Sequence, residues 1–316
     1  MNYFGKICLD KIDPSVEALF SMKTDNLPLP KALRLQLTGY CNMSCTMCPC
    51  SKRQDNTILS HDTLLRIVEV CGPYIKTLGM SYLGEPTLHP DFWGIVNYLA
   101  EGANWNIGLQ TNGTTLTETF CKRLLDSPIK SISISLDTLD PANSEKYRPG
   151  SDHERIRDGV LRLLELKERR RPNLIVILRV FSDEIRRQHY QDFFKAVLFW
   201  KSKGCYAITP GRMFNHAGAI TDVEDCCAQC RTHICPCIFP WYYLVVGVNG
   251  EIRPCCMDVE SKMTIANINE IDDLPTFWNG SKMRAIREGL LGRDKVNPLC
   301  ENCNWRYLIS ALELCP

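Results

Sequence analysis

The chain has 316 residues, of which 45% are hydrophobic and 23% are charged, and its formal net charge is +1. This balance is typical of a globular protein with a sizeable core, and it gives no electrostatic reason to expect nucleic acid or an anionic membrane as a partner. No stretch approaches the roughly 18 apolar residues of a membrane span. Charged residues, beginning with Lys6 and Asp10, interrupt the zone where a signal peptide would be apolar. The expected location is the cytoplasm.

Residues 1–32 are expected to form an N-terminal extension, with a helix near 14–23 and an extended segment around Pro28 and Pro30. From residue 33 to 210, short apolar runs alternate with longer amphipathic ones. Strands are expected at 33–37, 75–81, 105–110, 130–136, 173–180 and 205–210, with helices at 61–72, 90–102, 115–126, 153–170 and 186–203. Six such units in series predict an α/β fold with a parallel sheet, either open or closed into a partial barrel.

The composition changes after Pro210. Residues 211–236 are rich in glycine, cysteine and aspartate, and are interpreted as a linker. The segment 239-FPWYYLVVGVNGEIRP-254 is typical of a β-hairpin with Asn249 and Gly250 at its turn. A helix is expected around 276–290, followed by 300-CENC-303. Residues 237–316 therefore form a second, small domain in this interpretation.

Eighteen residues are cysteine, and many of them cluster at 41–50, 226–237, 255–256 and 300–303. Disulfide frameworks are typical of short secreted domains with thin cores, which this chain does not resemble. In a reducing compartment, clustered cysteines indicate metal or redox chemistry instead.

The first cluster, 38-TGYCNMSCTMCPC-50, directly follows the first predicted strand. In a (β/α) barrel such loops form the active face. Zinc would require a further thiol pair or nearby histidines, and no histidine lies between Cys41 and Cys50. Thiolates at Cys41, Cys45 and Cys48 fit a cubane iron–sulfur cluster better. Cys50 follows Pro49 and is interpreted as a packed thiol, which leaves one iron without a protein ligand.

Three further motifs lie at the ends of successive strands: 82-YLGEP-86, 110-QTNGTTL-116, and 131-SISISLDTLD-140 followed by 147-YRPG-150. In this order, and with the cysteine loop, they resemble the radical S-adenosylmethionine (radical SAM) enzymes over residues 33–210. Leu83 departs from the first glycine of that family's Gly-Gly-Glu-Pro turn.

The resemblance implies a partial (β/α)6 TIM-like barrel. It also implies a [4Fe–4S] cluster on Cys41, Cys45 and Cys48 whose open iron chelates the methionine moiety of S-adenosylmethionine. The implied cofactor-binding residues are Gly84, Glu85, Pro86, Asn112, Ser135, Asp137 and Arg148. An electron donor of the flavodoxin or ferredoxin type would serve as redox partner.

A second set of cysteines consists of Cys237, Cys255, Cys300 and Cys303. Four thiolates from two short elements can hold a cubane cluster or a zinc ion. In this context the pattern resembles the Twitch form of the SPASM domain, which implies one auxiliary [4Fe–4S] cluster. The run 226-CCAQCRTHICPC-237 holds further thiols, which allow a zinc site, a replacement auxiliary ligand or a reduced loop.

Cys256 follows a predicted ligand, so its side chain is expected on the opposite side of the chain. A thiol there would be able to return a hydrogen atom to a substrate radical, and a purely structural role is the alternative. Cys235 and Cys315 are further candidate hydrogen donors.

The function expected from the resemblance is cleavage of S-adenosylmethionine and abstraction of hydrogen from an unactivated C–H bond. The 32 residues before the first strand are too few for the winged-helix domain of many peptide-modifying members, which favours a small substrate such as a sugar or aminocyclitol. Surplus thiols favour epimerisation. Dehydrogenation with the auxiliary cluster as electron acceptor, radical modification of a ribosomal peptide, and a non-enzymatic iron–sulfur or zinc protein remain open.

Overall fold

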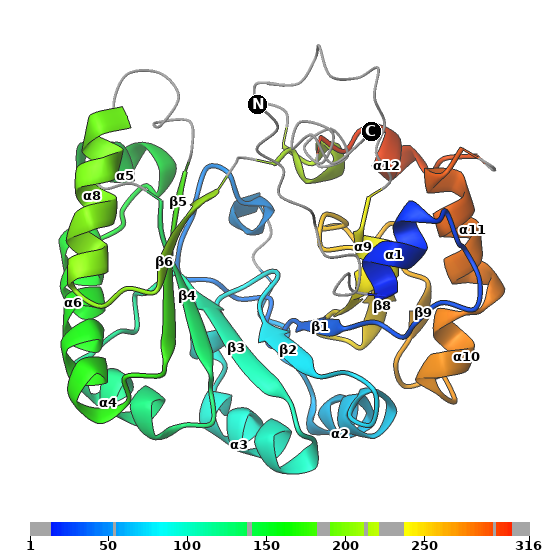
Figure 1. The fold of residues 1–316 in the computed structure, drawn as a ribbon, viewed down its shortest axis with the longest axis horizontal. Helices are drawn as coiled ribbons and strands as arrows, with labels where there is room; N and C mark the ends of the chain where they lie inside the picture. The colour runs from blue at the N-terminus through cyan, green and yellow to red at the C-terminus, as the bar shows by residue number, and fades with distance from the viewer. Residues whose placement is uncertain are drawn as a thin grey trace, which may run out of the picture.

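The computed structural model describes residues 14–52, 55–137, 141–181, 190–211, 214–220, 237–292 and 295–304. Parallel strands follow one another in chain order across a curved sheet (Figure 1). They are β1 (Ala32–Leu35), β2 (Thr77–Met80), β3 (Asn106–Thr111), β4 (Ser131–Asp137), β5 (Ile175–Phe181) and β6 (Ala207–Gly211). The predicted partial barrel is therefore confirmed, with all six strands within a few residues of their expected places.

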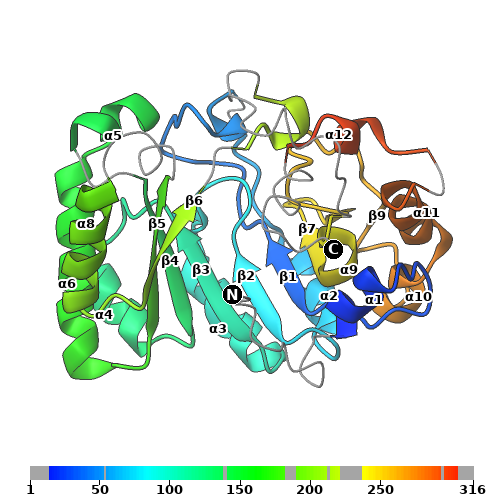
Figure 2. The ribbon, with the colours of Figure 1, turned by 45° about the horizontal axis from the view of Figure 1, so that its top comes forward.

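Helices connect these strands and lie outside the sheet (Figures 1 and 2). They are α2 (His61–Cys71), α3 (Phe92–Gly102), α4 (Glu118–Asp126), α5 (Pro141–Tyr147), α6 (His153–Arg170) and α8 (Tyr190–Ser202). Local capping explains where two of them begin. Ser60 Oγ accepts the Thr63 N–H of α2 at 3.2 Å, and Thr117 Oγ1 accepts the Phe120 N–H of α4 at 3.2 Å. Helix α5 was not predicted from the sequence.

Buried residues alternate with less buried ones along the strands, and this gives the sheet two different faces. Leu33 and Leu35 on β1 are fully buried, whereas Arg34 between them is half-buried. Neighbouring strands repeat the pattern, and their buried aliphatic residues form one core with the helices. The opposite side, which we call the concave face, carries small or polar residues: Arg34, Gly79, Gly108, Gln110, Ser133, Ser135 and Arg179.

The sheet does not end at β1. Strand β7 (Tyr243–Val246) pairs with β1 in parallel, and β8 (Glu251–Arg253) and β9 (Ala266–Asn267) extend the sheet in antiparallel fashion to nine strands. The predicted hairpin is present, with Gly250 at φ +83° in its turn. Its predicted start was wrong, because residues Phe239–Tyr242 form a helical turn, α9, with Pro240 in the first turn.

Short helices complete this second unit: α10 (Leu274–Trp278), α11 (Ser281–Leu290) and α12 (Pro298–Glu301). The single helix expected at 276–290 is thus divided in two. The N-terminal helix α1 (Pro14–Phe20) packs against α9. Arg287 on α11 is fully buried and donates to the carbonyls of Pro240 (2.9 Å) and Thr24 (3.3 Å). The segment before β1 is therefore part of this unit's core.

Within the ranges that the structure describes, we find no helix with the length and apolar character needed to cross a bilayer.

Candidate active site

The cysteine loop follows β1 and lies at the carboxyl end of the parallel strands. Cys45 is buried, while Cys41 and Cys48 are half-buried. The Cys48 N–H donates to the Cys45 carbonyl at 3.1 Å, which closes a tight turn between these two cysteines. The Thr46 N–H donates to the Tyr147 carbonyl at 3.0 Å, which anchors the loop to the end of α5.

Asn112 connects this loop to the turn after β2. Its backbone N–H donates to Glu85 Oε2 at 2.7 Å, and its side-chain Nδ2 donates to Asn42 Oδ1 at 2.9 Å. The same Nδ2 lies 3.8 Å from Cys41 Sγ. The other side-chain atom, Oδ1, accepts from the Thr114 N–H at 2.9 Å. A continuous hydrogen-bonded path thus runs from Glu85 through Asn112 to Cys41.

The Glu85 carboxylate is buried and accepts several hydrogen bonds. Besides the Asn112 N–H, it accepts the hydroxyls of Thr87 and Thr111, each at 2.7 Å. Burial raises the pKa of Glu85, and these donors act in the opposite direction. Glu85 therefore joins the loops after β2 and β3, a role that its predicted place among the cofactor-binding residues did not include. Whether it also contacts the cofactor stays a prediction.

Gly84 occupies a position that no other residue fits. Its φ is +77°, and an added Cβ would lie 2.0 Å from the Thr38 carbonyl oxygen. The next residue pairs with the cysteine loop, since the Glu85 N–H donates to the Tyr40 carbonyl at 2.8 Å. Pro86 is buried and opens the 3-10 turn η3 (Pro86–Leu88). The resulting turn brings backbone close to the cysteine loop despite Leu83 in the place of a glycine.

Cys50 has a structural role that the sequence did not indicate. It lies in the 3-10 turn η2 (Pro49–Lys52), and its sulfur accepts the Gly84 N–H at 3.2 Å. A hydrogen bond with the Cys50 thiol, followed by burial, raises the pKa of Cys48. Cys50 thus bridges the cysteine loop and the glycine turn.

The other predicted cofactor residues lie around the same end of the sheet. Ser135 is half-buried on β4 and is paired in register with Arg179 on β5. Asp137 ends β4, and its side chain is outside the described part. Arg148 is buried just after α5 and donates to Met43 Sδ at 3.5 Å, which places its guanidinium under the cysteine loop. The network also includes Asn42 and Thr114, which sequence reasoning missed although each lies within two residues of a predicted site residue.

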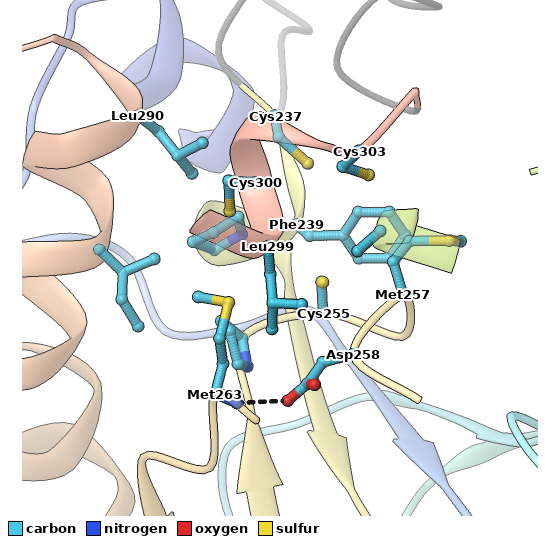
Figure 3. Close-up of a pocket in the computed structure, with 14 residues that line it drawn as sticks. Cys237, Phe239, Cys255, Met257, Asp258, Met263, Leu290, Leu299, Cys300 and Cys303 are labelled. Atoms are coloured by element: carbon cyan, nitrogen blue, oxygen red, sulfur yellow. Dashed lines mark hydrogen bonds between the residues drawn. The ribbon is translucent and has the colours of Figure 1, made fainter. Parts of the chain in front are cut away.

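The four cysteines of the second set line one pocket in the second unit (Figure 3). Cys237 precedes α9, Cys255 follows β8, and Cys300 and Cys303 come from α12 and the turn after it. In Figure 3 the Cys255 thiol points toward the other three sulfurs from the opposite side. The rest of the lining is largely apolar, including Phe239, Met257, Leu290 and Leu299.

These thiols surround a space instead of meeting at one point. Among the residues that the structure describes, no three His, Cys, Asp or Glu side chains are arranged to hold a single metal ion. Burial raises the pKa of the Cys237 and Cys255 thiols, and the neighbouring thiols raise it further. Such groups become thiolates when a metal binds them.

Cys256 lies between this pocket and the barrel. Its thiol is half-buried, and the charged groups within electrostatic reach include Arg34 on β1 and Arg179 on β5. Both arginines belong to the concave face, and Cys256 also packs, as Cys255 does, against the cluster that contains Met257 and Cys303. Cys235 and Cys315, together with Cys226, Cys227 and Cys230, lie outside the described residues.

Family models match both units of the chain. The model of the radical SAM superfamily matches residues 35–193, which is half of the chain. The chain belongs to the radical SAM superfamily. A second model, described as an iron–sulfur cluster-binding domain (SPASM), matches residues 235–304 and so includes all four cysteines of the pocket. The non-enzymatic alternative is thereby set aside.

Curated relatives match over less than half of the chain. A probable GTP 3',8-cyclase of Methanococcus maripaludis is 30% identical over 139 residues, 43% of this chain and 46% of the relative. A tungsten-containing aldehyde ferredoxin oxidoreductase cofactor-modifying protein of Pyrococcus furiosus is 31% identical over 117 residues, 36% of this chain and 33% of the relative. The chain spans less than half the length of these relatives.

Solved structures share the fold over nearly the whole chain. BtrN in complex with AdoMet and 2-DOIA superposes with a TM-score of 0.64 at 19% identity, covering 88% of this chain and 94% of BtrN. Streptococcus suis SuiB bound to the precursor peptide SuiA gives a TM-score of 0.67 at 17% identity, covering 93% of this chain and 73% of SuiB. At these identities the similarity shows the fold alone, and the covered shares include both units of this chain.

Membership in the superfamily implies S-adenosylmethionine with a [4Fe–4S] cluster, and the SPASM domain implies auxiliary iron–sulfur chemistry. The donor sets fit these groups: three thiols on one loop beside a glycine turn, and four thiols around one pocket. We propose that Cys41, Cys45 and Cys48 hold the first cluster, and that Cys237, Cys255, Cys300 and Cys303 hold one auxiliary cluster.

Proposed function

We propose that this enzyme epimerises a carbon centre of a small substrate, with Cys256 as the hydrogen-atom donor. The observation that supports the proposal is the position of Cys256, within electrostatic reach of Arg34 and Arg179 on the concave face. A substrate inside the barrel would therefore lie between the cofactor end of the strands and this thiol. Inversion of a carbon requires that one group removes the hydrogen atom and that a second group, at a separate position, returns it.

Held at Cys41, Cys45 and Cys48, the cluster and S-adenosylmethionine would supply the radical chemistry that removes a hydrogen atom from a substrate C–H bond. Cys256 then gives the hydrogen atom of its S–H bond to the opposite face of the carbon, so one C–H bond forms as the S–H bond breaks. The sulfur-centred radical that remains takes up one electron and one proton. The electron comes from a flavodoxin- or ferredoxin-type donor, and the net change in the substrate is inversion alone.

A second candidate is dehydrogenation with the auxiliary cluster as electron acceptor. Cys256 packs against the buried cluster that contains Cys303, which supports an auxiliary site close to Cys256. A substrate radical near this site could lose its electron there and a proton to solvent. The product would then be two hydrogens lighter than the substrate.

Turnover in heavy water separates the two candidates. The anaerobically reconstituted enzyme is incubated in deuterium oxide with candidate substrates drawn from the products of neighbouring genes. Epimerisation predicts a product about one mass unit heavier than the substrate, with one deuterium at a carbon that does not exchange with solvent. A Cys256→Ala variant is expected to keep cleaving S-adenosylmethionine while forming no epimer. A product lighter by two hydrogens, formed equally well by Cys256→Ala, would exclude epimerisation.

A further inference from the structure

Two arginines lie on the concave face without a carboxylate partner. Arg34 Nη1 donates to Ser81 Oγ at 3.5 Å, and Arg179 Nε donates to Ser133 Oγ at 3.0 Å. Both acceptors are neutral hydroxyls. Within the described part of the chain, none of the ion pairs includes either arginine. Among the described side chains, these two guanidinium charges on one face are not paired with an acidic group.

The two charges also influence each other. The Arg179 side chain is exposed, yet desolvation by the protein atoms around it, followed by the charge of Arg34, lowers the pKa of Arg179. The Arg34 guanidinium carbon lies 5.0 Å from the centre of the Tyr243 ring, and its buried Nε has no hydrogen-bond partner in the structure. Within the described residues, the concave face therefore carries both an Arg34 N–H group without an acceptor and two positive charges without an acidic partner.

Two glycines lie beside Arg34 on the concave face. Its partner in register on β2 is Gly79, which in turn pairs with Gly108 on β3. Neither glycine carries a side chain over the concave face. A Cβ added at Gly79 would find its nearest neighbour, Ser81 Oγ, at 3.6 Å, which is ordinary contact distance. Position 79 thus tolerates a side chain sterically, and glycine there leaves the face open next to the guanidinium.

We propose that Arg34 and Arg179 together bind an anionic group of the substrate, a carboxylate or a phosphate, beside Cys256. Planar guanidinium groups bind both kinds of anion through paired charge-assisted hydrogen bonds. An anion between them would replace mutual repulsion by attraction in a partly desolvated place. The proposal takes from the proposed function only that the substrate occupies the concave face, and it narrows the substrate class to small acids or phosphate esters.

The cofactor's own carboxylate is the competing occupant, because Ser135, one of the predicted cofactor residues, is paired in register with Arg179. Arg34 lies within β1, before the cysteine loop begins, whereas Arg148 donates to Met43 inside that loop. Titration with saturating S-adenosylmethionine therefore decides whether the arginine pair stays accessible once the cofactor is bound.

Isothermal titration of the anaerobically reconstituted enzyme tests the proposal, with inorganic phosphate and malonate as separate probes. Each titration is run with and without saturating S-adenosylmethionine. At least one probe is expected to bind, and the tighter of the two identifies phosphate or carboxylate as the recognised group. Binding is expected to weaken about 10- to 100-fold in Arg34→Gln and in Arg179→Gln, because each removes charge-assisted hydrogen bonds.

Arg169→Gln is the matched control, because Arg169 is exposed on α6 and pairs with Glu165. It is expected to bind both probes as the unmodified enzyme does. Reductive cleavage of S-adenosylmethionine without substrate should persist in Arg34→Gln and Arg179→Gln, which shows that these variants fold and hold their cofactors. Failure of both probes to bind the unmodified enzyme, equal binding by the arginine variants, or displacement by S-adenosylmethionine would overturn the proposal. None of these titrations depends on whether Cys256 donates hydrogen, so the two proposals fail independently.

Discussion

The hydroxyl of Tyr82 donates a hydrogen bond of 2.5 Å to the backbone carbonyl of Asp258. Tyr82 begins the glycine turn of the barrel, and Asp258 follows the cysteine pair of the second unit. The Asp258 carboxylate accepts the N–H groups of Lys262 and Met263, both at 2.8 Å, so its carbonyl belongs to a fixed loop. Tyr82 has φ +127°, which few residues other than glycine adopt. One side chain thus couples the proposed cofactor turn to the proposed auxiliary site.

Tyr82→Phe removes this hydrogen bond and keeps the ring, over which the Arg253 guanidinium lies at 5.0 Å. We expect a loss of about 1 kcal/mol in the free energy of unfolding and faster amide hydrogen exchange in residues 257–263. Mass spectrometry of exchange measures the second effect directly. Unchanged exchange in that loop would mean that the hydrogen bond does not restrain it.

Gly84→Ala is expected to cost about 3 kcal/mol or more, because it combines an unfavourable φ with a clash. Gly150→Ala provides a matched control, since Gly150 has φ +72° but nothing within 4 Å of an added Cβ. We expect the control to lose only about 1–2 kcal/mol and to retain cleavage of S-adenosylmethionine, which Gly84→Ala should lose. Thermal denaturation and 5'-deoxyadenosine formation are the measurements. Equal destabilisation of both variants would show that the contact with Thr38 does not matter.

Asn112→Ala should loosen the cysteine loop, because it removes the hydrogen bond to Asn42 and the contact with Cys41. Each buried hydrogen bond contributes about 0.5–1.5 kcal/mol, so we expect at least about a 10-fold slower cleavage of S-adenosylmethionine. Thr114→Val removes one hydroxyl partner and leaves the Asn112 side chain in place. Its effect should be smaller. An Asn112→Ala rate equal to that of the unmodified enzyme would contradict the path from Glu85 to Cys41.

Alanine at Cys300 should halve the iron content if the four cysteines of the pocket hold one cubane cluster. With four irons in each cluster, we expect about eight irons per chain before the change and about four after it. Cys256→Ala is the control and should keep both clusters. Iron assays and Mössbauer spectra check the outcome. Loss of iron in the Cys256 variant instead would make Cys256 a ligand and exclude it as hydrogen donor.

His89 predicts a pH-dependent stability. It is buried after η3 and its Nδ1 accepts the Asp91 N–H at 3.1 Å. Burial lowers the pKa of His89 below its ordinary value of 6.5. The unfolded chain therefore binds the proton more readily, so stability is complete above about pH 6.5 and declines below it. His89→Asn should flatten the fall in melting temperature between about pH 7 and 5.5, whereas exposed His61→Asn should not.

The barrel could be predicted because its signals are local. Alternating leucines around Arg34, the Ser60 cap and the cysteine spacing each lie within a few residues of what they specify. The helical turn Phe239–Tyr242 was missed because its aromatic residues also suit a strand. The pairing of β7 with β1 was not predictable, since strands about 200 residues apart find each other through packing and not through sequence pattern.

Within the candidate site, residue identity was easier to predict than residue role. The glycine turn and Asn112 follow family motifs, but the use of Glu85 to join two loops depends on Thr87 and Thr111, which no motif marked. Arg34 and Arg179 were passed over because a charged residue in a strand usually faces solvent. Only the register of the strands shows that both lie on the same face of the sheet.

The pairing of β7 with β1 has a consequence for how the chain can be divided. Without residues 237–304, the backbone N–H and C=O groups of β1 on that side would be unpaired, next to buried leucines. Exposed strand edges of this kind recruit other chains. A truncated barrel is therefore expected to self-associate and precipitate. In this interpretation the cysteine-rich unit prevents aggregation by covering the edge of β1, in addition to holding the proposed auxiliary cluster.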